Sequence, residues 1–327
     1  MPRKKRISSK FFPFSPGIPW KIERGKYILP QISSNIWNQV LVDKNIVITV
    51  PFGGLLESFF SLSVAEALNF FDGKNHKVFW LGPSQYSIFP RLQNLSTICY
   101  KNITKEILEK YPAPIFFDQQ NNVYINILHN YLTRYSYWGL YPEPVDTPIL
   151  FQIFKNMCIP FDKKYIPHLR KMHGISFADK LYETNKLRPR NKFVLIILDE
   201  NSTENTLNWS VRNIKEFNQL ATTKRLKTVV FTKNINKFYG SNILCFEYNI
   251  KNILDLISKS WMILSNKIDW TFIGMVLSGE THLVARETKG PYDLFSNAEL
   301  ISAENSIFTD RNPLSPIDVF SICEGLL

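Results

Sequence analysis

Apolar runs alternate with amphipathic stretches along most of this chain. The run IVITV at residues 46–50 is almost wholly β-branched, as expected of a parallel strand that is buried on both faces. Gly53 and Gly54 then permit a tight turn. After the turn, apolar side chains recur at intervals of three or four, which predicts a helix, at Phe60, Val64, Ala67, Leu68 and Phe71. A strand over residues 77–81 completes a unit typical of half a doubly wound fold.

The alternation continues along the chain and divides into two series. In the first series, further strands are expected at 97–100 and 115–117, a helix at 104–111, and a helix with a loop at 122–138. Several prolines and the basic segment LYETNKLRPRNK then interrupt the pattern. The second series opens with a buried strand at 193–198. Its other expected elements are helices at 211–222, 250–259 and 271–277, and strands at 228–232, 243–246, 262–264 and 282–285.

This repetition of a series that opens on a strand predicts two domains. A chain of 327 residues also exceeds the usual size of a single hydrophobic core. The expected fold class is α/β, with two Rossmann-like lobes facing a cleft and a basic N-terminal extension before them. The pattern places the extension at residues 1–45, the N-terminal lobe at 46–185 and the C-terminal lobe at 186–327.

The basic charge of the chain is concentrated in the N-terminal extension. The formal net charge is +11. Residues 1–30 hold eight basic side chains and one acidic one, Glu23, so they carry +7 and leave +4 for the rest of the chain. Because aromatic residues lie among these charges, residues 1–26 are suited to contact with nucleic acid or another anionic surface. The alternative is that the segment PRKKR is an ordinary solvated terminus.

The composition disfavours three classes of protein: metalloproteins, dithiol redox proteins and membrane-spanning proteins. The four cysteines are scattered without a CxxC pair, and the closest histidines, His168 and His173, are five residues apart. No apolar run approaches the roughly 18 residues needed to cross a bilayer. We therefore expect no metal site, no dithiol redox site and no transmembrane segment. A reducing cytoplasm is the simplest compartment.

Several sequence patches follow one another in a distinctive order. The strand FVLIIL is followed by Asn208-Trp209-Ser210, the helix VRNIKEFNQLA, the strand KTVVFT and the pair NILDLISKSWMILSN. In the first series, Glu57 stands after a glycine turn where a helix opens. Over about residues 46–290 these patches resemble GT-B glycosyltransferases of the heptosyltransferase type, family nine. The resemblance implies an acceptor lobe followed by a donor lobe that binds a nucleotide sugar as co-substrate. It also implies a glycan or other hydroxyl compound as acceptor, and no cofactor.

One loop departs from the pattern of that family. After the strand in WMILSN the family usually has Asp-Ser/Thr-Gly, whereas this chain has Lys267-Ile268-Asp269-Trp270. Lys267 would supply charge to a diphosphate, but the bulky Ile268 and Trp270 would block the close approach that glycine permits. A catalytically inactive binding or assembly protein is therefore one alternative function. Another is a viral DNA-modifying glycosyltransferase that grips its substrate with the basic extension.

The resemblance implies an inverting, metal-independent sugar transfer. This chemistry needs a base for the acceptor hydroxyl and positive charge for the departing diphosphate. The resemblance implies Glu57 as the catalytic base, and a helix N-terminus would favour the ionised form that a proton acceptor needs. The residues expected to bind the donor are Lys233, Ser265, Asn266, Lys267 and Thr271. The alternatives are that both lysines are solvated surface residues and that Thr271 is only a helix N-cap. A further residue, His282, is expected to be structural.

Overall fold

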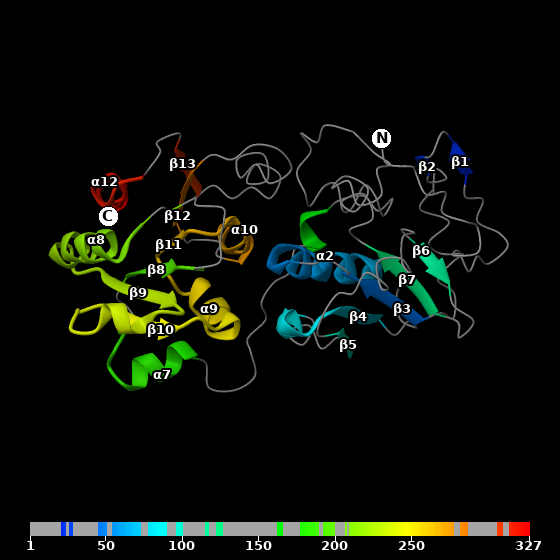
Figure 1. The fold of residues 1–327 in the computed structure, drawn as a ribbon, viewed down its shortest axis with the longest axis horizontal. Coiled ribbons are helices and arrows are strands. Elements are labelled where there is room, and N and C mark those ends of the chain that lie inside the picture. The colour runs from blue at the N-terminus through cyan, green and yellow to red at the C-terminus, as the bar shows by residue number, and fades with distance from the viewer. Residues whose placement is uncertain are drawn as a thin grey trace, which may run out of the picture. The chain divides into compact units, whose positions relative to one another are not determined.

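The computed structural model divides into two compact units, residues 1–167 (unit 1) and 168–327 (unit 2). Each unit has its own sheet (Figure 1). The structure describes residues 21–23, 26–28, 45–50, 54–72, 78–89, 96–100, 115–117, 122–126, 162–165, 177–189, 192–199, 207, 209–277, 282–286, 306–309 and 314–327.

The sheet of unit 1 has five strands in the order β5-β4-β3-β7-β6. Neighbouring strands from β5 to β7 are parallel, and β6 is antiparallel to β7. Their bounds are β3 Asn45–Thr49, β4 Val78–Pro83, β5 Ser96–Tyr100, β6 Ile115–Phe117 and β7 Asn122–Asn126. The strands predicted in the first series are thereby confirmed. The helix predicted at 104–111 lies outside the described residues.

The prediction of a helix with a loop at 122–138 is wrong at its start. Residues 122–126 form β7, which pairs with β3 on one side and with β6 on the other. Val123, Tyr124 and Ile125 are residue types that favour strands, and pairing on both edges satisfies the backbone polar groups. Long-range pairing therefore decides the structure of this segment. Residues 127–138 lie outside the described part of the chain.

Helix α2, Leu55–Asp72, is buried on most sides in unit 1. Its apolar residues Leu55, Leu56, Phe59, Phe60, Leu62, Val64, Ala65 and Ala67 are buried, and so are Ser58, Ser61 and Ser63. The fully buried Trp80 of β4 donates its indole N–H to Ser61 Oγ at 2.9 Å, which ties the helix to the sheet. Gly82 is required beside this indole, because a Cβ there would lie 2.4 Å from the Trp80 ring.

The sheet of unit 2 has six parallel strands in the order β10-β9-β8-β11-β12-β13. Counted along the chain from β8, this is the order 3-2-1-4-5-6 of the Rossmann fold. The strands are β8 Phe193–Ile197, β9 Lys227–Thr232, β10 Leu244–Glu247, β11 Met262–Ser265, β12 His282–Arg286 and β13 Ser306–Thr309. The helices are α7 Phe177–Glu183, α8 Val211–Thr223, α9 Ile250–Ile257, α10 Ile268–Leu277 and α12 Pro316–Leu326. The elements predicted for the second series are confirmed in type and order, and β13 and α12 follow them unpredicted.

Strand β8 lies at the centre of unit 2, and all five of its residues are buried. Val194 and Ile196 belong to an apolar cluster that includes residues of α8 and α12. Figure 1 shows these two helices on one face of the sheet and α9 and α10 on the other. A strand covered on both faces by helices explains the uninterrupted apolar run FVLIIL.

Trp209 joins the start of α8 to the start of α12. Its indole Nε1 donates to the carbonyl oxygen of Leu314 at 2.6 Å. Ser210 caps α8 and Ser315 caps α12, each through a reciprocal pair of hydrogen bonds with the third residue of its helix. The N-termini of the two helices are thus fixed to each other as well as capped.

The division between the units lies earlier in the chain than the predicted boundary between residues 185 and 186. Helix α7 accounts for the difference, because it packs on α9 of unit 2. The Ala178 amide of α7 donates to the Asp255 carboxylate of α9 at 2.8 Å. Phe177 also lies edge-on to Phe246 of β10, with ring centroids 5.1 Å apart.

Only a small part of the predicted basic extension is described. Two short strands, β1 Lys21–Glu23 and β2 Lys26–Ile28, pair in antiparallel fashion. The rest of residues 1–44 lies outside the described chain. Among the helices that the structure describes, none is long and apolar enough to cross a bilayer.

We predict that Trp209→Phe lowers the free energy of unfolding by about 1–3 kcal/mol, because the buried carbonyl of Leu314 loses its indole donor. Urea denaturation followed by circular dichroism measures the loss. The matched control is Trp261→Phe, which makes the same change at a partly exposed indole and should cost less. Equal losses in the two variants would contradict a special role for the Trp209 hydrogen bond.

Candidate functional site

The strands of unit 2 are parallel, so the residues that follow them meet at one edge of the sheet. Asp199 follows β8, Lys233 follows β9, and Asn266 and Lys267 follow β11. Strand β8 lies between β9 and β11, and the strand order reverses between β8 and β11. Doubly wound sheets bind their ligands at this topological switch point. Three of the predicted donor-binding residues are therefore brought to the edge where a ligand is expected.

The side chain of Asn266 fixes the main chain of Asp199. The Asp199 amide donates to Asn266 Oδ1 at 2.8 Å, and Asn266 Nδ2 donates to the Asp199 carbonyl oxygen at 2.9 Å. These two bonds extend the pairing of β8 with β11 beyond the ends of the strands. Both ends of the Asn266 amide are thus engaged with the protein, and its predicted contact with a donor stays a prediction.

Ser265 has a similar anchoring place in the structure. Its hydroxyl donates to the carbonyl oxygen of Ile197 at 3.3 Å and accepts a hydrogen bond from the Lys267 amide at 3.0 Å. The residue is 4% exposed. Ser265 therefore connects β8 to the turn that begins α10, and a role in donor binding also stays a prediction.

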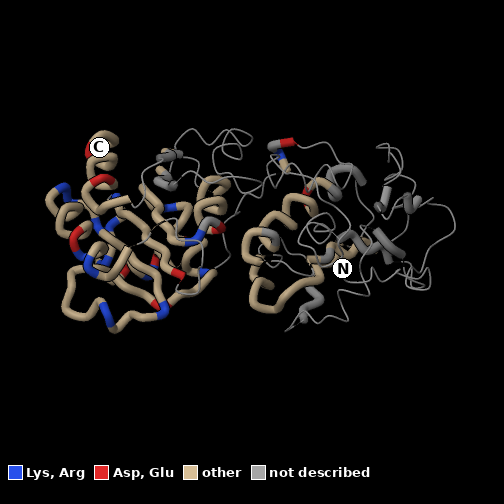
Figure 2. Tube along the Cα trace, turned by 45° about the horizontal axis from the view of Figure 1, so that its top comes forward, with Lys and Arg blue, Asp and Glu red and all other residues tan. Residues whose placement is uncertain are grey.

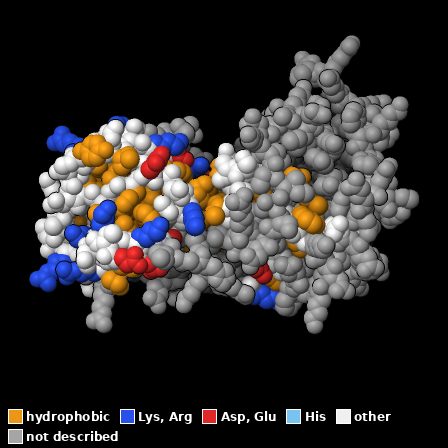
Figure 3. Space-filling view, turned by 90° about the horizontal axis from the view of Figure 1, so that it is seen from below, with side chains coloured by type: hydrophobic (Ala, Val, Ile, Leu, Met, Phe, Trp, Pro, Cys, Tyr) orange, Lys and Arg blue, Asp and Glu red, His pale blue; other side chains and the backbone are white. Residues whose placement is uncertain are grey.

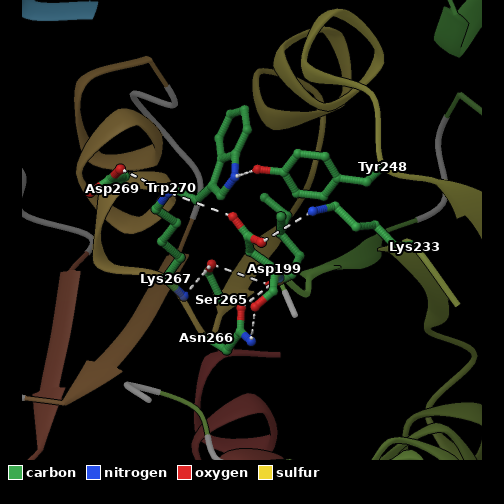
Figure 4. Close-up of polar contacts among 9 residues, drawn as sticks. Asp199, Lys233, Tyr248, Ser265, Asn266, Lys267, Asp269 and Trp270 are labelled. Atoms are coloured by element: carbon green, nitrogen blue, oxygen red, sulfur yellow. Dashed lines mark hydrogen bonds and ion pairs between the residues drawn. The ribbon is translucent and has the colours of Figure 1, made fainter. Parts of the chain in front are cut away.

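Lys233 and Lys267 approach the same carboxylate from two different strand ends (Figure 4). Lys233 Nζ lies 3.9 Å from Asp199 Oδ1, and Lys267 Nζ lies 3.6 Å from Asp199 Oδ2. Lys267 Nζ also lies 3.3 Å from Asp269 Oδ2. The side chain of Asp199 is 13% exposed, against 46% for Lys233 and 23% for Lys267. Both ammonium groups remain within reach of a ligand that arrives from solvent.

The charges at this edge balance one another, unlike those of the unit as a whole. Lys233 and Lys267 stand against Asp199 and Asp269. Elsewhere in unit 2, Lys and Arg outnumber Asp and Glu among the described residues (Figure 2). Among the described residues, these two lysines and two carboxylates therefore cancel one another, whereas the unit is basic.

Tyr248 and Trp270 form an aromatic wall beside the charged residues. Trp270 Nε1 donates to the Tyr248 hydroxyl at 2.6 Å, and their rings meet at 70° with centroids 6.2 Å apart. Lys233 Nζ lies 5.9 Å from the centre of the Tyr248 ring. Because Trp270 is fully buried, its indole does not project into solvent at this edge. The side chain of Ile268, the other bulky residue of the loop, lies outside the description.

Helix α10 begins at Ile268, three residues before the predicted start at Thr271. The Trp270 amide already bonds to the Lys267 carbonyl at 3.2 Å, and Asp269 in the first turn suits the positive end of the helix dipole. Thr271 is therefore inside the helix, so its interpretation as the N-cap is wrong. The residue is 2% exposed. Its predicted contact with a phosphate oxygen stays a prediction.

Glu57, the predicted base, belongs to unit 1. It is the third residue of α2, whose first turn includes a hydrogen bond from the Ser58 amide to the Gly54 carbonyl at 3.2 Å. Its place at a helix N-terminus is thus confirmed. The side chain lies outside the description, and its catalytic role stays a prediction.

His282 lies at the opposite edge of the unit 2 sheet, where β12 begins. Its ring meets Trp261 edge-on, with centroids 5.5 Å apart. Burial and the nearby charge of Lys192 lower the pKa of His282, so the imidazole is neutral at pH 7. Lys192 Nζ itself lies 5.0 Å from the centre of the Trp261 ring. These contacts agree with the structural role that the sequence predicted.

Sequence reasoning missed Asp199 and Tyr248. Asp199 is the first charged residue after the buried strand FVLIIL, and Tyr248 directly follows β10. A polar residue at the carboxyl end of a predicted parallel strand was the available signal. As for metals, the described residues contain no group of three or more His, Cys, Asp or Glu side chains that would hold an ion.

We predict that Asn266→Ala loosens the main chain at Asp199. The Asp199 amide loses its Asn266 acceptor, so its hydrogen exchange should become at least about tenfold faster, as expected for a hydrogen bond worth about 1.4 kcal/mol. The amide of Leu198 is the internal control, because it bonds to the Phe231 carbonyl at 2.9 Å independently of Asn266. Unchanged exchange at Asp199 would contradict the anchoring role of Asn266.

Comparisons with known proteins find solved structures with a similar fold, but at very low sequence identity. No protein-family model and no curated protein matches the sequence. A solved glycosyl transferase of family 9 from Veillonella parvula is 11% identical, with 88% of this chain and 90% of that chain covered and a TM-score of 0.53. The ADP-heptose heptosyltransferase II of E. coli is 10% identical over 86% of this chain and 98% of its own, with a TM-score of 0.56. A second E. coli heptosyltransferase, solved with ADP, is 10% identical over 86% of this chain and all of its own, with a TM-score of 0.52. Together with the two Rossmann-like sheets, these likenesses confirm the predicted α/β fold of the GT-B type.

Proposed function

We propose that this chain is a glycosyltransferase that moves a sugar from a nucleoside diphosphate sugar to a hydroxyl group of a glycan or another acceptor. The observation that carries the proposal is the meeting of Lys233 and Lys267 at the switch point of the unit 2 sheet. Ligands of such sheets bind at this point, and lysine is a common partner of phosphate. The likeness to heptosyltransferases, one of them solved with ADP, supports the same ligand class.

The donor lobe in this proposal is unit 2. As the bond to the sugar breaks, negative charge develops on the departing diphosphate and has to be stabilised. The ammonium groups of Lys233 and Lys267 and the backbone amides at the start of α10 supply positive charge at the edge. These groups allow a reaction without a metal ion.

The base in this proposal is Glu57 at the start of α2. Its carboxylate takes the proton of the acceptor hydroxyl while that oxygen attacks the anomeric carbon from the side opposite the diphosphate. The bond between the anomeric carbon and the diphosphate oxygen breaks, and the configuration at that carbon is inverted. The positive end of the helix dipole favours the ionised carboxylate that the step needs.

The acceptor is proposed to be a glycan rather than DNA. On the face seen in Figure 3, Lys and Arg side chains are spread over unit 2 and do not form one continuous stripe that would follow a phosphate backbone. Of residues 1–26, which motivated the DNA-modifying alternative, the structure describes only residues 21–23 and 26.

Cys245 and Cys323, the two cysteines whose side chains are described, take no part in this chemistry. Burial raises the pKa of Cys245 to about 11 and that of Cys323 to about 12, so both thiols stay protonated at neutral pH. Both are free rather than joined in disulfides. Free thiols support the proposal of a reducing compartment, and we propose the cytoplasm.

A second candidate function is a binding or assembly protein without transferase activity. The observation that favours it is the neutral charge balance at the carboxyl edge, where Asp199 and Asp269 offset the two lysines. A site for a diphosphate usually carries excess positive charge. The two functions differ in whether this edge binds a nucleoside diphosphate sugar at all.

We predict that one or more nucleoside diphosphate sugars stabilise the protein against heat. At a donor concentration of roughly 100 times Kd, the stabilisation should be about 2.7 kcal/mol. The measurement is a thermal melt with a panel of sugars carrying each of the four common bases. Lys267→Ala should lose the shift, whereas Lys215→Ala, an exposed lysine on α8, should keep it. A full panel without any shift would favour the binding protein.

We predict that Glu57→Gln lowers the rate of transfer by about a hundred- to ten-thousand-fold, because the variant has no base for the acceptor proton. The assay follows release of nucleoside diphosphate from a stabilising donor in the presence of a glycan acceptor fraction. The donor-induced thermal shift should persist, since Glu57 is on unit 1. Glu66→Gln, an exposed position on the same helix, is the matched control and should keep normal turnover. Near-normal turnover of Glu57→Gln would remove Glu57 from the mechanism.

A further inference from the structure

We propose that Asp199 acts as an internal competitor of the diphosphate, which weakens binding of the product nucleoside diphosphate more than binding of the donor sugar. This inference rests on the proposed function. It starts from one observation in Figure 4: the two oxygens of one carboxylate face the two lysines that are expected to hold the phosphates.

The carboxylate cannot withdraw from the lysines by a movement of its main chain. The Asn266 amide holds both the N–H and the carbonyl group of Asp199. Strand β8, which ends two residues before Asp199, is buried along its whole length. With a side chain 13% exposed, Asp199 is also poorly screened by water. Its negative charge therefore stays at the edge when a ligand arrives.

The two ion pairs are loose enough for a phosphate to replace the carboxylate. The distances of 3.6 Å and 3.9 Å exceed the 2.7–2.9 Å of a charge-assisted hydrogen bond. A phosphate oxygen that forms short bonds to Lys233 and Lys267 must come close to Asp199, because the carboxylate faces both ammonium groups. Like charges at such short distances repel each other in a partly buried site. Asp199 therefore opposes binding of the same anion that the lysines attract.

This opposition distinguishes the product from the donor. The diphosphate group of a nucleotide sugar is esterified at both ends, whereas transfer leaves a free terminal phosphate with additional negative charge. A fixed carboxylate repels the more highly charged product more strongly. Asp199 thus weakens binding of the product, which eases its release, and weakens binding of the donor by a smaller amount.

The test is binding of ADP, CDP, GDP and UDP, and of the corresponding nucleoside diphosphate glucoses, to the full chain and to three variants. Asp199→Asn removes the charge and keeps the side-chain shape. We expect this variant to bind each nucleoside diphosphate that the protein binds about tenfold more tightly in titration calorimetry. Its affinity for the corresponding nucleotide sugar should rise by a smaller factor. The charge-matched control is Glu324→Gln. This variant also removes one negative charge from unit 2, at a residue that pairs with Lys224 in the turn before β9. Both affinities should stay unchanged.

Three results would overturn the inference. Unchanged or weaker binding of nucleoside diphosphate by Asp199→Asn would show that the carboxylate positions the lysines instead of competing with the ligand. An equal gain for product and donor would remove the proposed discrimination. Failure of the unmodified protein and of all three variants to bind any of these eight probes would refute the proposed function, and the inference with it. Asp199→Ser, checked by circular dichroism for folding, is the second variant at this position and should shift the affinities in the same direction as Asp199→Asn.

Discussion

The arrangement of the candidate site depends on the pairing of β8 with β11, which the Asn266 amide continues past the ends of both strands. Parallel pairing alone would bring Asp199 and Lys267 to one edge, but loops at strand ends move freely unless something holds them. Two hydrogen bonds of 2.8 Å and 2.9 Å hold the main chain of Asp199, and two lysines lie 3.6 Å and 3.9 Å from its carboxylate. Behind this edge, β8 is buried on both faces, and Trp209 links the helices that cover one of them. The main chain of the candidate site therefore continues directly from the packed core of unit 2.

Much of the fold could be predicted from the sequence because short local patterns of residues indicate its strands and helices. A β-branched run such as IVITV at residues 46–50 or FVLIIL at residues 193–198 indicates a buried parallel strand wherever it occurs. Strand β7 was missed because its aromatic-rich neighbourhood hid a five-residue strand that depends on pairing with β3 and β6. The start of α10 was missed for a similar reason. The Ser265 hydroxyl, which accepts from the Lys267 amide in that turn, also donates to Ile197 of β8, and the local sequence does not reveal this long-range contact.

The candidate site was only partly predictable, because the sequences of the strands do not indicate their order in the sheet. Residues after β9 and β11 were identified as candidates one by one, but nothing local indicates that β8 separates these strands. Once that order is known, Asp199 becomes the residue that both lysines share. The same knowledge changes the interpretation of Asn266 and Ser265: in the structure the Ser265 hydroxyl bonds to Ile197 of β8, and the Asn266 amide bonds to Asp199 just after β8.

The neutral charge balance at the edge has a physical cause that does not depend on which function is correct. Two ammonium groups that approach one another without a ligand repel, and partial burial strengthens the repulsion. Asp199 removes this penalty in the free protein, and Asp269 does the same for Lys267 from the first turn of α10. The carboxylates that make it possible to gather the lysines therefore also lower their attraction for phosphate. A site built in this way has its lysines in place before the ligand arrives, at the cost of a lower affinity for phosphate.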